Sequence, residues 1–70
     1  MNKTWDKIER RFISTPDKMK SFFNDVEKLC RRYDLSIAHE DGNGGFLIEE
    51  YSQQNIEWLR DASKNYKDKQ

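Results

Sequence analysis

The sequence predicts a small single-domain α+β protein over residues 1–70, ordered α-α-β-β-α, with a two-stranded antiparallel hairpin packed on helices. Residues 16–33 and 53–66 place apolar side chains at helical spacing, and between them two alternating runs flank a glycine-rich loop. Hydrophobic residues make up 34% of the chain and charged residues 37%, which leaves a thin core. Because a chain of this size buries only ~60% of its surface on folding, we expect oligomerisation to complete the core.

The first expected element is a short amphipathic helix over residues 1–13. Trp5, Ile8 and Phe12 recur at the i, i+3, i+7 spacing of one helix face. Thr4 precedes them and is a residue type that caps helix N-termini. We expect this helix to offer an apolar stripe to a partner.

The strongest periodic signal predicts a second helix from Pro16 to about Tyr33. Thr15 as N-cap and Pro16 at the first helical position are typical of a helix start. Two cations, Arg31 and Arg32, fall in the last turn, where the helix dipole favours positive charge. The apolar positions form one stripe, Met19, Phe22, Phe23, Val26, Leu29, Cys30 and Tyr33, in which Cys30 is interpreted as inert packing.

A β-hairpin is predicted around the loop DGNGG, because the runs before and after it alternate in polarity. The alternation places four apolar side chains on one face, which we expect to cover the core: Leu35, Ile37, Phe46 and Ile48. The opposite face, with Ser36, Ala38, Glu40, Leu47, Glu49 and Tyr51, would remain wet in a monomer.

The register of this hairpin is open, because the loop contains both Asp-Gly and Asn-Gly. A two-residue turn at Asp41 and Gly42 would pair Ile37 with Phe46. A four-residue loop, 41–44, would instead pair Ile37 with Ile48.

The last expected element is a helix from about Gln53 to Tyr66, capped by Ser52 and followed by a frayed tail over 67–70. Together with the elements above, the helix predicts a core of Phe22, Phe23, Val26, Leu29, Ile37, Ile48 and Leu59.

Charge and cysteine content exclude several function classes. Lys plus Arg and Asp plus Glu both number 13, so the net charge is zero, which disfavours a binder of duplex nucleic acid. One cysteine cannot form an internal disulfide framework or a multi-cysteine zinc site. The sequence has one histidine and no nucleophile motif, so we expect no enzyme, cofactor or metal centre. With no signal peptide and no spanning segment, a cytoplasmic protein is expected.

The loop itself is the candidate ligand site. Glycines let backbone N–H groups approach an anion or nucleobase closely, and one turn does not need all three. Trp58 could stack on a base while Arg60 pairs with a phosphate. The alternatives are turn chemistry for the loop, flank packing for Trp58 and core packing for Phe46. The candidate ligand-binding residues are His39, Glu40, Asp41, Gly42, Asn43, Gly44, Gly45, Tyr51, Trp58 and Arg60.

Residues 35–60, LSIAHEDGNGGFLIEEYSQQNIEWLR, resemble a group of very small phage-encoded proteins with the pattern LSxxHEDGxGxFxIE followed by NIEWL. HEDG and NIEWL are the specific parts, and residues 1–13 lie outside the resemblance. The sequence departs at Asn43, where the group has a second histidine, and at Gly45, where it has alanine.

The resemblance implies a phage sponge in the infected bacterial host cell. Such a protein sequesters a cyclic oligonucleotide signal of host defence. The alternative is a phage protein that inhibits a host factor by direct protein–protein contact. A third possibility is a structural or regulatory phage protein without a small ligand.

Overall fold

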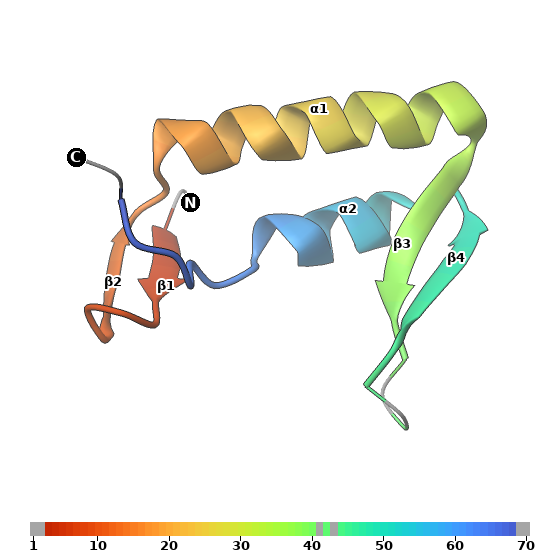
Figure 1. The fold of residues 1–70 in the computed structure, drawn as a ribbon. Helices are drawn as coiled ribbons and strands as arrows, with labels where there is room; N and C mark the ends of the chain where they lie inside the picture. Colours follow the sequence, from red (N-terminus) through yellow and green to blue (C-terminus); the bar gives the residue numbers. More distant parts are fainter. Residues whose placement is uncertain (1–2, 41, 43, 69–70) are drawn as a thin grey trace.

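The computed structural model describes residues 3–40, 42 and 44–68 (Figure 1). It is a small α+β fold of order β-β-α-β-β-α, with two separate two-stranded antiparallel sheets. The elements are β1 (Lys3–Asp6), β2 (Arg11–Ser14), α1 (Asp17–Tyr33), β3 (Leu35–His39), β4 (Phe46–Glu50) and α2 (Gln53–Arg60).

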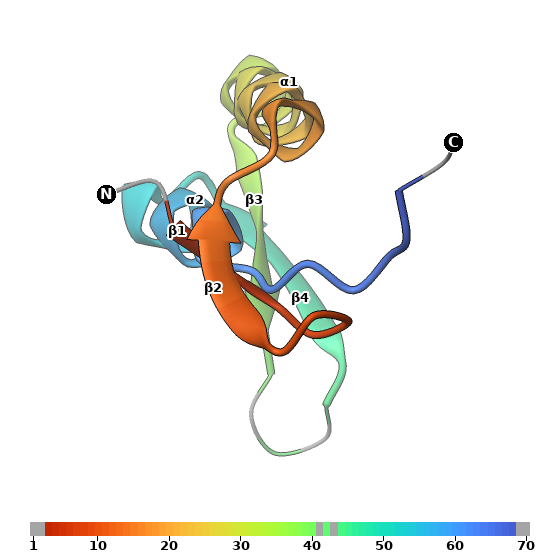
Figure 2. The same ribbon diagram turned by 90° about the vertical axis from the view of Figure 1, so that its left-hand side faces the viewer.

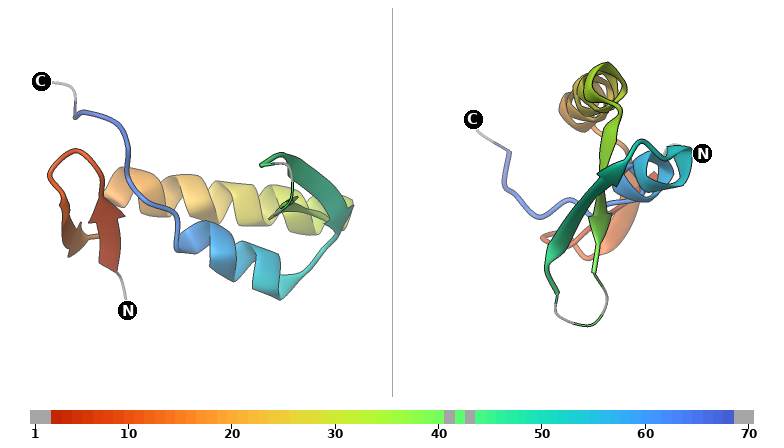
Figure 3. Two further views of the ribbon diagram at one scale, coloured as in Figure 1. Left: turned by 90° about the horizontal axis from the view of Figure 1, so that it is seen from below. Right: turned by 90° about the vertical axis from the view of Figure 1, so that its right-hand side faces the viewer.

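The two helices lie side by side and antiparallel, and the two hairpins extend from opposite ends of α1 (Figures 1 and 3). Viewed along α1, α2 lies on one side of β3 and β4 on the other (Figure 2).

The predicted helix over 1–13 is wrong, because this segment forms the β1–β2 hairpin. Asp6 Oδ1 accepts hydrogen bonds from the N–H groups of Ile8 (2.9 Å) and Glu9 (3.1 Å), which turns the chain back. The helical spacing of Trp5 and Phe12 has another origin: the two residues are cross-strand partners, with ring centroids 5.0 Å apart.

The expected caps of the first two helices are also wrong. Thr4 lies in β1, and its hydroxyl oxygen lies 2.7 Å from that of Thr15. Thr15 therefore does not cap α1. Pro16 occupies the N-cap position, and the helix begins at Asp17. The rest of α1 is confirmed: it ends at Tyr33 with Arg31 and Arg32 in its last turn.

The second helix is shorter than predicted. Ser52 is confirmed as its N-cap, since the Ser52 Oγ accepts a hydrogen bond from the Asn55 N–H at 3.4 Å. The helix ends at Arg60 instead of Tyr66, because the following chain crosses to β1 (Figure 1). There the Lys64 N–H donates to the Trp5 carbonyl oxygen at 2.8 Å, a pairing that a continued helix would forbid.

The four-residue loop is the register that forms, since Ile37 pairs with Ile48. The orientation expected for this sheet is wrong. Ser36 is 1% exposed, whereas Ile48 is 65% exposed, so the small-residue face packs inward. The reason is α2: Asn55 donates from Nδ2 to Ser36 Oγ at 3.0 Å, and only small side chains allow that close approach.

The core differs accordingly from the predicted one. Of the seven residues expected there, only Phe23 is buried; Val26 and Leu59 are half-buried, and the other four are exposed. The buried apolar side chains among the described residues are Met19, Phe23, Cys30, Ala38 and Ile56.

Candidate ligand-binding site

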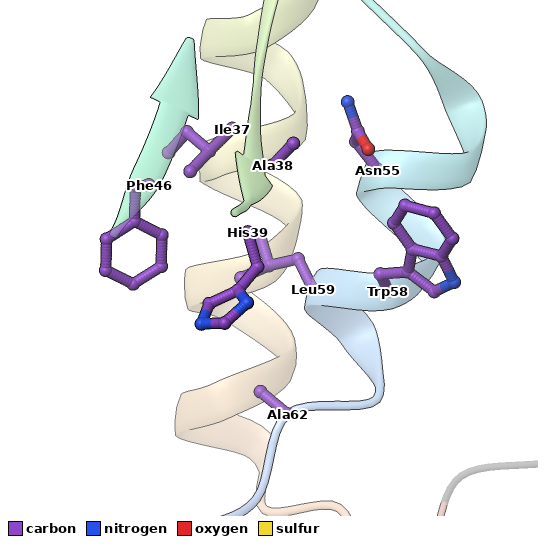
Figure 4. A pocket seen from close by; sticks show the side chains of 8 residues that line it. All are labelled: Ile37, Ala38, His39, Phe46, Asn55, Trp58, Leu59 and Ala62. Atoms are coloured by element: carbon purple, nitrogen blue, oxygen red, sulfur yellow. The ribbon is translucent and has the colours of Figure 1, made fainter. Parts of the chain in front are cut away.

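A groove of about 440 Å³ lies between the β3–β4 hairpin and α2 (Figure 4). This volume falls within the ~300–1,000 Å³ range of small-molecule sites. The lining is mostly apolar and consists of Ile37, Ala38, His39, Phe46, Asn55, Trp58, Leu59 and Ala62.

Three rings border the groove. His39 and Phe46 are cross-strand partners on the hairpin, with ring centroids 5.9 Å apart in an edge-on arrangement. Trp58 projects from α2 on the other side of the groove and is 61% exposed (Figure 4). Exposed rings on both walls suit a flat aromatic ligand, because stacking needs only a π-face.

Asn55 provides the polar part of the groove. It is buried, and both of its amide hydrogens are used: Nδ2 donates to Ser36 Oγ at 3.0 Å and to Glu49 Oε2 at 2.8 Å. The side-chain oxygen is the atom that remains to accept a hydrogen bond from a ligand. Asn55 thereby ties α2 to the sheet and adds an acceptor to the groove.

The described residues of the glycine-rich loop, Gly42, Gly44 and Gly45, lie at the tip of the hairpin and are not among the residues that line the groove. The Gly44 N–H donates to the Glu40 carbonyl oxygen at 3.1 Å, and the Glu40 N–H donates to the Gly45 carbonyl oxygen at 2.9 Å. Gly44 has a φ of 70°, a left-handed conformation that favours glycine. Two further candidate residues, Asp41 and Asn43, lie outside the described residues.

Gly42 and Gly45 have no such explanation. A Cβ atom at either position would meet nothing within 4 Å. The conformation at Gly44 therefore accounts for one glycine, and the contacts of the described residues do not account for the other two.

The remaining candidates, Tyr51 and Arg60, point away from the groove. Tyr51 Oη donates to Gln53 Oε1 at 2.8 Å, and the Arg31 guanidinium lies 4.9 Å from the centre of the Tyr51 ring. Arg60 Nη2 donates to Glu27 Oε1 at 2.6 Å. Sequence proximity suggested a shared site for Trp58 and Arg60. A two-residue offset is a rotation of ~200° about the helix axis, however, so Trp58 and Arg60 point to opposite sides of α2.

The charge of Arg60 is matched at the α1–α2 contact. Hydrogen bonds from Arg60 and Arg31 hold the pKa of the Glu27 carboxyl below its ordinary value. Arg31 Nη2 lies 3.1 Å from Glu27 Oε2, so both guanidinium groups share one carboxylate. These two arginines stabilise the contact between α1 and α2, and their guanidinium groups bind Glu27.

Sequence reasoning missed five of the groove residues, Ile37, Ala38, Asn55, Leu59 and Ala62. A signal for Asn55 was present: it is a polar residue three positions before Trp58, on the side of the last helix that carries Ile56 and Leu59. A polar side chain on a packing face needs a partner, and here the partner is the sheet.

Within the described residues, no group of three or more His, Cys, Asp or Glu side chains could hold a metal ion. Neither helix in the described ranges has the length and apolar character needed to cross a membrane. Comparison of the chain with protein-family models, curated proteins and solved structures finds no match in any of the three.

Proposed function

We propose that this protein binds and sequesters a small nucleotide without catalysis, with the nucleobase held in the groove between the β3–β4 hairpin and α2. The observation that carries the proposal is the set of three rings, His39, Phe46 and Trp58, around a base-sized groove. Flat apolar surfaces on two walls and one buried acceptor at Asn55 are what a nucleobase requires.

Each residue has a defined role in this proposal. Trp58 stacks on the base and Phe46 closes the opposite wall. His39, at the end of β3, donates to a base edge or to a phosphate. Among the described residues, no Lys or Arg lines the groove. Recognition therefore rests on the base more than on phosphate charge, and we expect affinity to depend weakly on salt.

The resemblance to small phage proteins supports a particular biological role. In this role the protein is an anti-defence sponge for a cyclic oligonucleotide, acting in the cytoplasm of an infected bacterial cell. Glycine at positions 42 and 45 is consistent with a ligand that extends towards the loop, where backbone N–H groups can approach a phosphate. We also expect the protein to act as a homo-oligomer, because its buried core is thin.

The test is calorimetric titration of the full chain with cyclic dinucleotides, cyclic trinucleotides and linear mononucleotides. Trp58→Ala should weaken binding by ~5- to 150-fold, since stacking contributes ~1–3 kcal/mol per base. Phe12→Ala is the matched control, because Phe12 is a ring of similar exposure, 64% against 61% for Trp58, and lies on the β1–β2 hairpin, outside the groove. Absence of binding by the folded wild type at high micromolar nucleotide would contradict the proposal.

A second candidate function is inhibition of a host protein through the β1–β2 hairpin. Trp5, Ile8 and Phe12 are exposed on this hairpin, and the rings of Trp5 and Phe12 pack against each other. Exposed apolar patches of this kind mark protein-binding surfaces. The same pair of variants separates the two functions: here Phe12→Ala should abolish capture of a host protein, and Trp58→Ala should leave it intact.

A further inference from the structure

One side of α1 exposes an apolar stripe formed by Phe22, Val26, Leu29 and Tyr33, here called the seam. Phe22, Leu29 and Tyr33 are exposed and Val26 is half-buried. On the other side of the helix, Glu27 binds Arg60 of α2. A hollow of about 210 Å³ lined by Val26, Leu29, Tyr33, Ile37 and Ile48, among others, joins the seam to the outward face of the β3–β4 sheet.

The seam has the residue spacing of a coiled coil. Its members are separated by four, three and four residues, which is the spacing of the a and d positions of a heptad. An antiparallel copy that places Val26 opposite Leu29 also places Phe22 opposite Tyr33, because both pairs are centred between residues 27 and 28. The stripe is thus complementary to itself across a two-fold axis.

The charges beside the seam match the same arrangement. Asp25 and Arg32 are exposed, lie on one flank of the seam and are separated by one heptad. Their midpoint lies within one residue of the centre of the apolar pairs. In an antiparallel pair of helices, residues on this flank face their equivalents, so Asp25 of each chain would face Arg32 of the other.

From these two matching registers we propose that a second copy of this chain covers the seam, with the two α1 helices antiparallel and Asp25 paired with Arg32 in both directions. A parallel pair would bring Asp25 near Cys30, which is buried in its own chain and cannot form an ion pair.

The exposed area agrees with a dimer. Outside the groove, the following large apolar side chains are each between 44% and 65% exposed: Phe22, Leu29, Tyr33, Leu35 and Ile48. At ~150–250 Å² for an aromatic side chain and somewhat less for an aliphatic one, they expose on the order of 500 Å². Stable interfaces bury ~800 Å² per partner, of which roughly 65% is apolar in homodimers, or about 500 Å². Because the core is thin, the exposed apolar face must be buried whenever the chain is folded. A second copy of the chain is always present to bury it, whereas a transient partner is not.

The test is sedimentation equilibrium of the full chain and of charge-exchanged variants. The wild type should have twice the 8.5 kDa mass of one chain. Asp25→Arg alone and Arg32→Asp alone create two like-charge contacts in each homodimer, and each should weaken self-association by about tenfold or more. The double variant should regain wild-type association, and so should an equimolar mixture of the two single variants.

Lys7→Glu is the control, because it changes the charge of the chain by the same amount as Arg32→Asp at an exposed position in the turn between β1 and β2, on the hairpin at the far end of α1. It should associate like the wild type. Circular dichroism establishes that each variant is folded, and the mixture restores association without any further mutation. A wild type that sediments as a single 8.5 kDa chain at ~100 µM would overturn the proposal and assign the seam to a different protein. Single variants that associate like the wild type would overturn it as well.

Discussion

The two hairpins are built alike and held differently. Each has two antiparallel strands, an arrangement that is marginal in water without further packing. The β1–β2 hairpin is held by buried polar side chains, Thr4, Asp6 and Lys64. The β3–β4 hairpin is held through its small-residue face, where Ser36 and Ala38 lie against α2. The difference teaches that a strand pair can be fixed without placing its largest apolar side chains inward.

The contact at β1–β2 is a buried ion pair with additional partners. Lys64 Nζ lies 3.7 Å from Asp6 Oδ2, and it donates to the Tyr66 carbonyl oxygen at 2.6 Å. Both charged side chains are almost fully covered. Such pairs contribute little net stability when intact, but removal of one partner is costly. They define where a segment docks. Here the pair fixes Lys64, which follows α2, beside Asp6 of β1.

The contact at β3–β4 uses neutral hydrogen bonds. Ser36 Oγ donates to the Glu50 carbonyl oxygen at 2.8 Å and accepts from Asn55. This network orients the hairpin with its apolar face outward, where a second copy can cover it.

The largest effect is expected from Ile56→Ala. Ile56 is 2% exposed, and its helix contacts α1 and β3. The cavity should lower the free energy of unfolding by ~2–5 kcal/mol, a large part of the stability of so small a chain. Urea unfolding measures the loss. Trp58→Ala in the same helix is the control and should cost much less, because Trp58 is exposed. Equal losses for the two variants would contradict the placement of α2.

A smaller, local effect is expected from Lys64→Met, which should release β1–β2 and leave β3–β4 in place. The change leaves the Asp6 carboxylate buried without its cation. Hydrogen exchange should accelerate at the Lys7 N–H, which is bonded to the Lys64 carbonyl oxygen, and not at Ser36. Adding Asp6→Asn should recover part of the protection. Uniform acceleration across both hairpins would show that they unfold together.

Acid should also release β1–β2 before β3–β4, with a smaller effect than Lys64→Met. Hydrogen bonds from the N–H groups of Glu9 and Ile8, together with the charge of Lys64, hold the pKa of Asp6 below its ordinary value of 3.8. A lowered folded-state pKa contributes stability above pH 3.8, and this stability is lost as the pH falls through the folded-state value. Trp5 fluorescence in a Trp58→Phe background should follow this loss. Asp6→Asn should remove that part of the pH dependence, and an unchanged profile would refute the assignment.

The smallest effect concerns the tip of the second hairpin. Gly44→Ala should lower stability by about 1 kcal/mol, because the φ of 70° is strained for a residue with a side chain. Gly45→Ala should be close to neutral, since its Cβ meets nothing within 4 Å. Thermal unfolding compares the two. A nucleotide affinity that falls for folded Gly45→Ala would assign that glycine to the ligand, and an unchanged affinity would exclude it from the site.

The sequence predicted the segments governed by local signals. The α1 helix, the Ser52 cap and the β3–β4 strands follow from periodicity and capping. Cross-strand packing of Trp5 on Phe12 imitated a helical stripe, and the pairing of Lys64 with β1, which ended α2 early, joins residues far apart in sequence. No local pattern encodes that pairing.

The inward and outward faces of β3–β4 could not be assigned for a related reason. Alternation defines two faces and does not state which one packs against the chain's own helices. The larger apolar face was expected inside, because a monomer would bury it. The small face packs inward instead, since Asn55 on α2 requires a close polar neighbour at Ser36. The displacement of Arg60 from the groove has a simpler cause, the two-residue offset from Trp58 along a helix.

The parallel bridge between Asp6 and Lys64 also orders events during synthesis. β1 leaves the ribosome first, but the residue that pairs beside it is made almost sixty positions later. Contacts of such sequence separation form slowly, because most of the chain must be gathered to make them. In the nascent chain, the strands of the N-terminal hairpin can pair locally, but the hairpin cannot dock beside residue 64 until that residue is made. Its exposed Trp5 and Phe12 are therefore the part of the newborn protein most open to a chaperone or to aggregation.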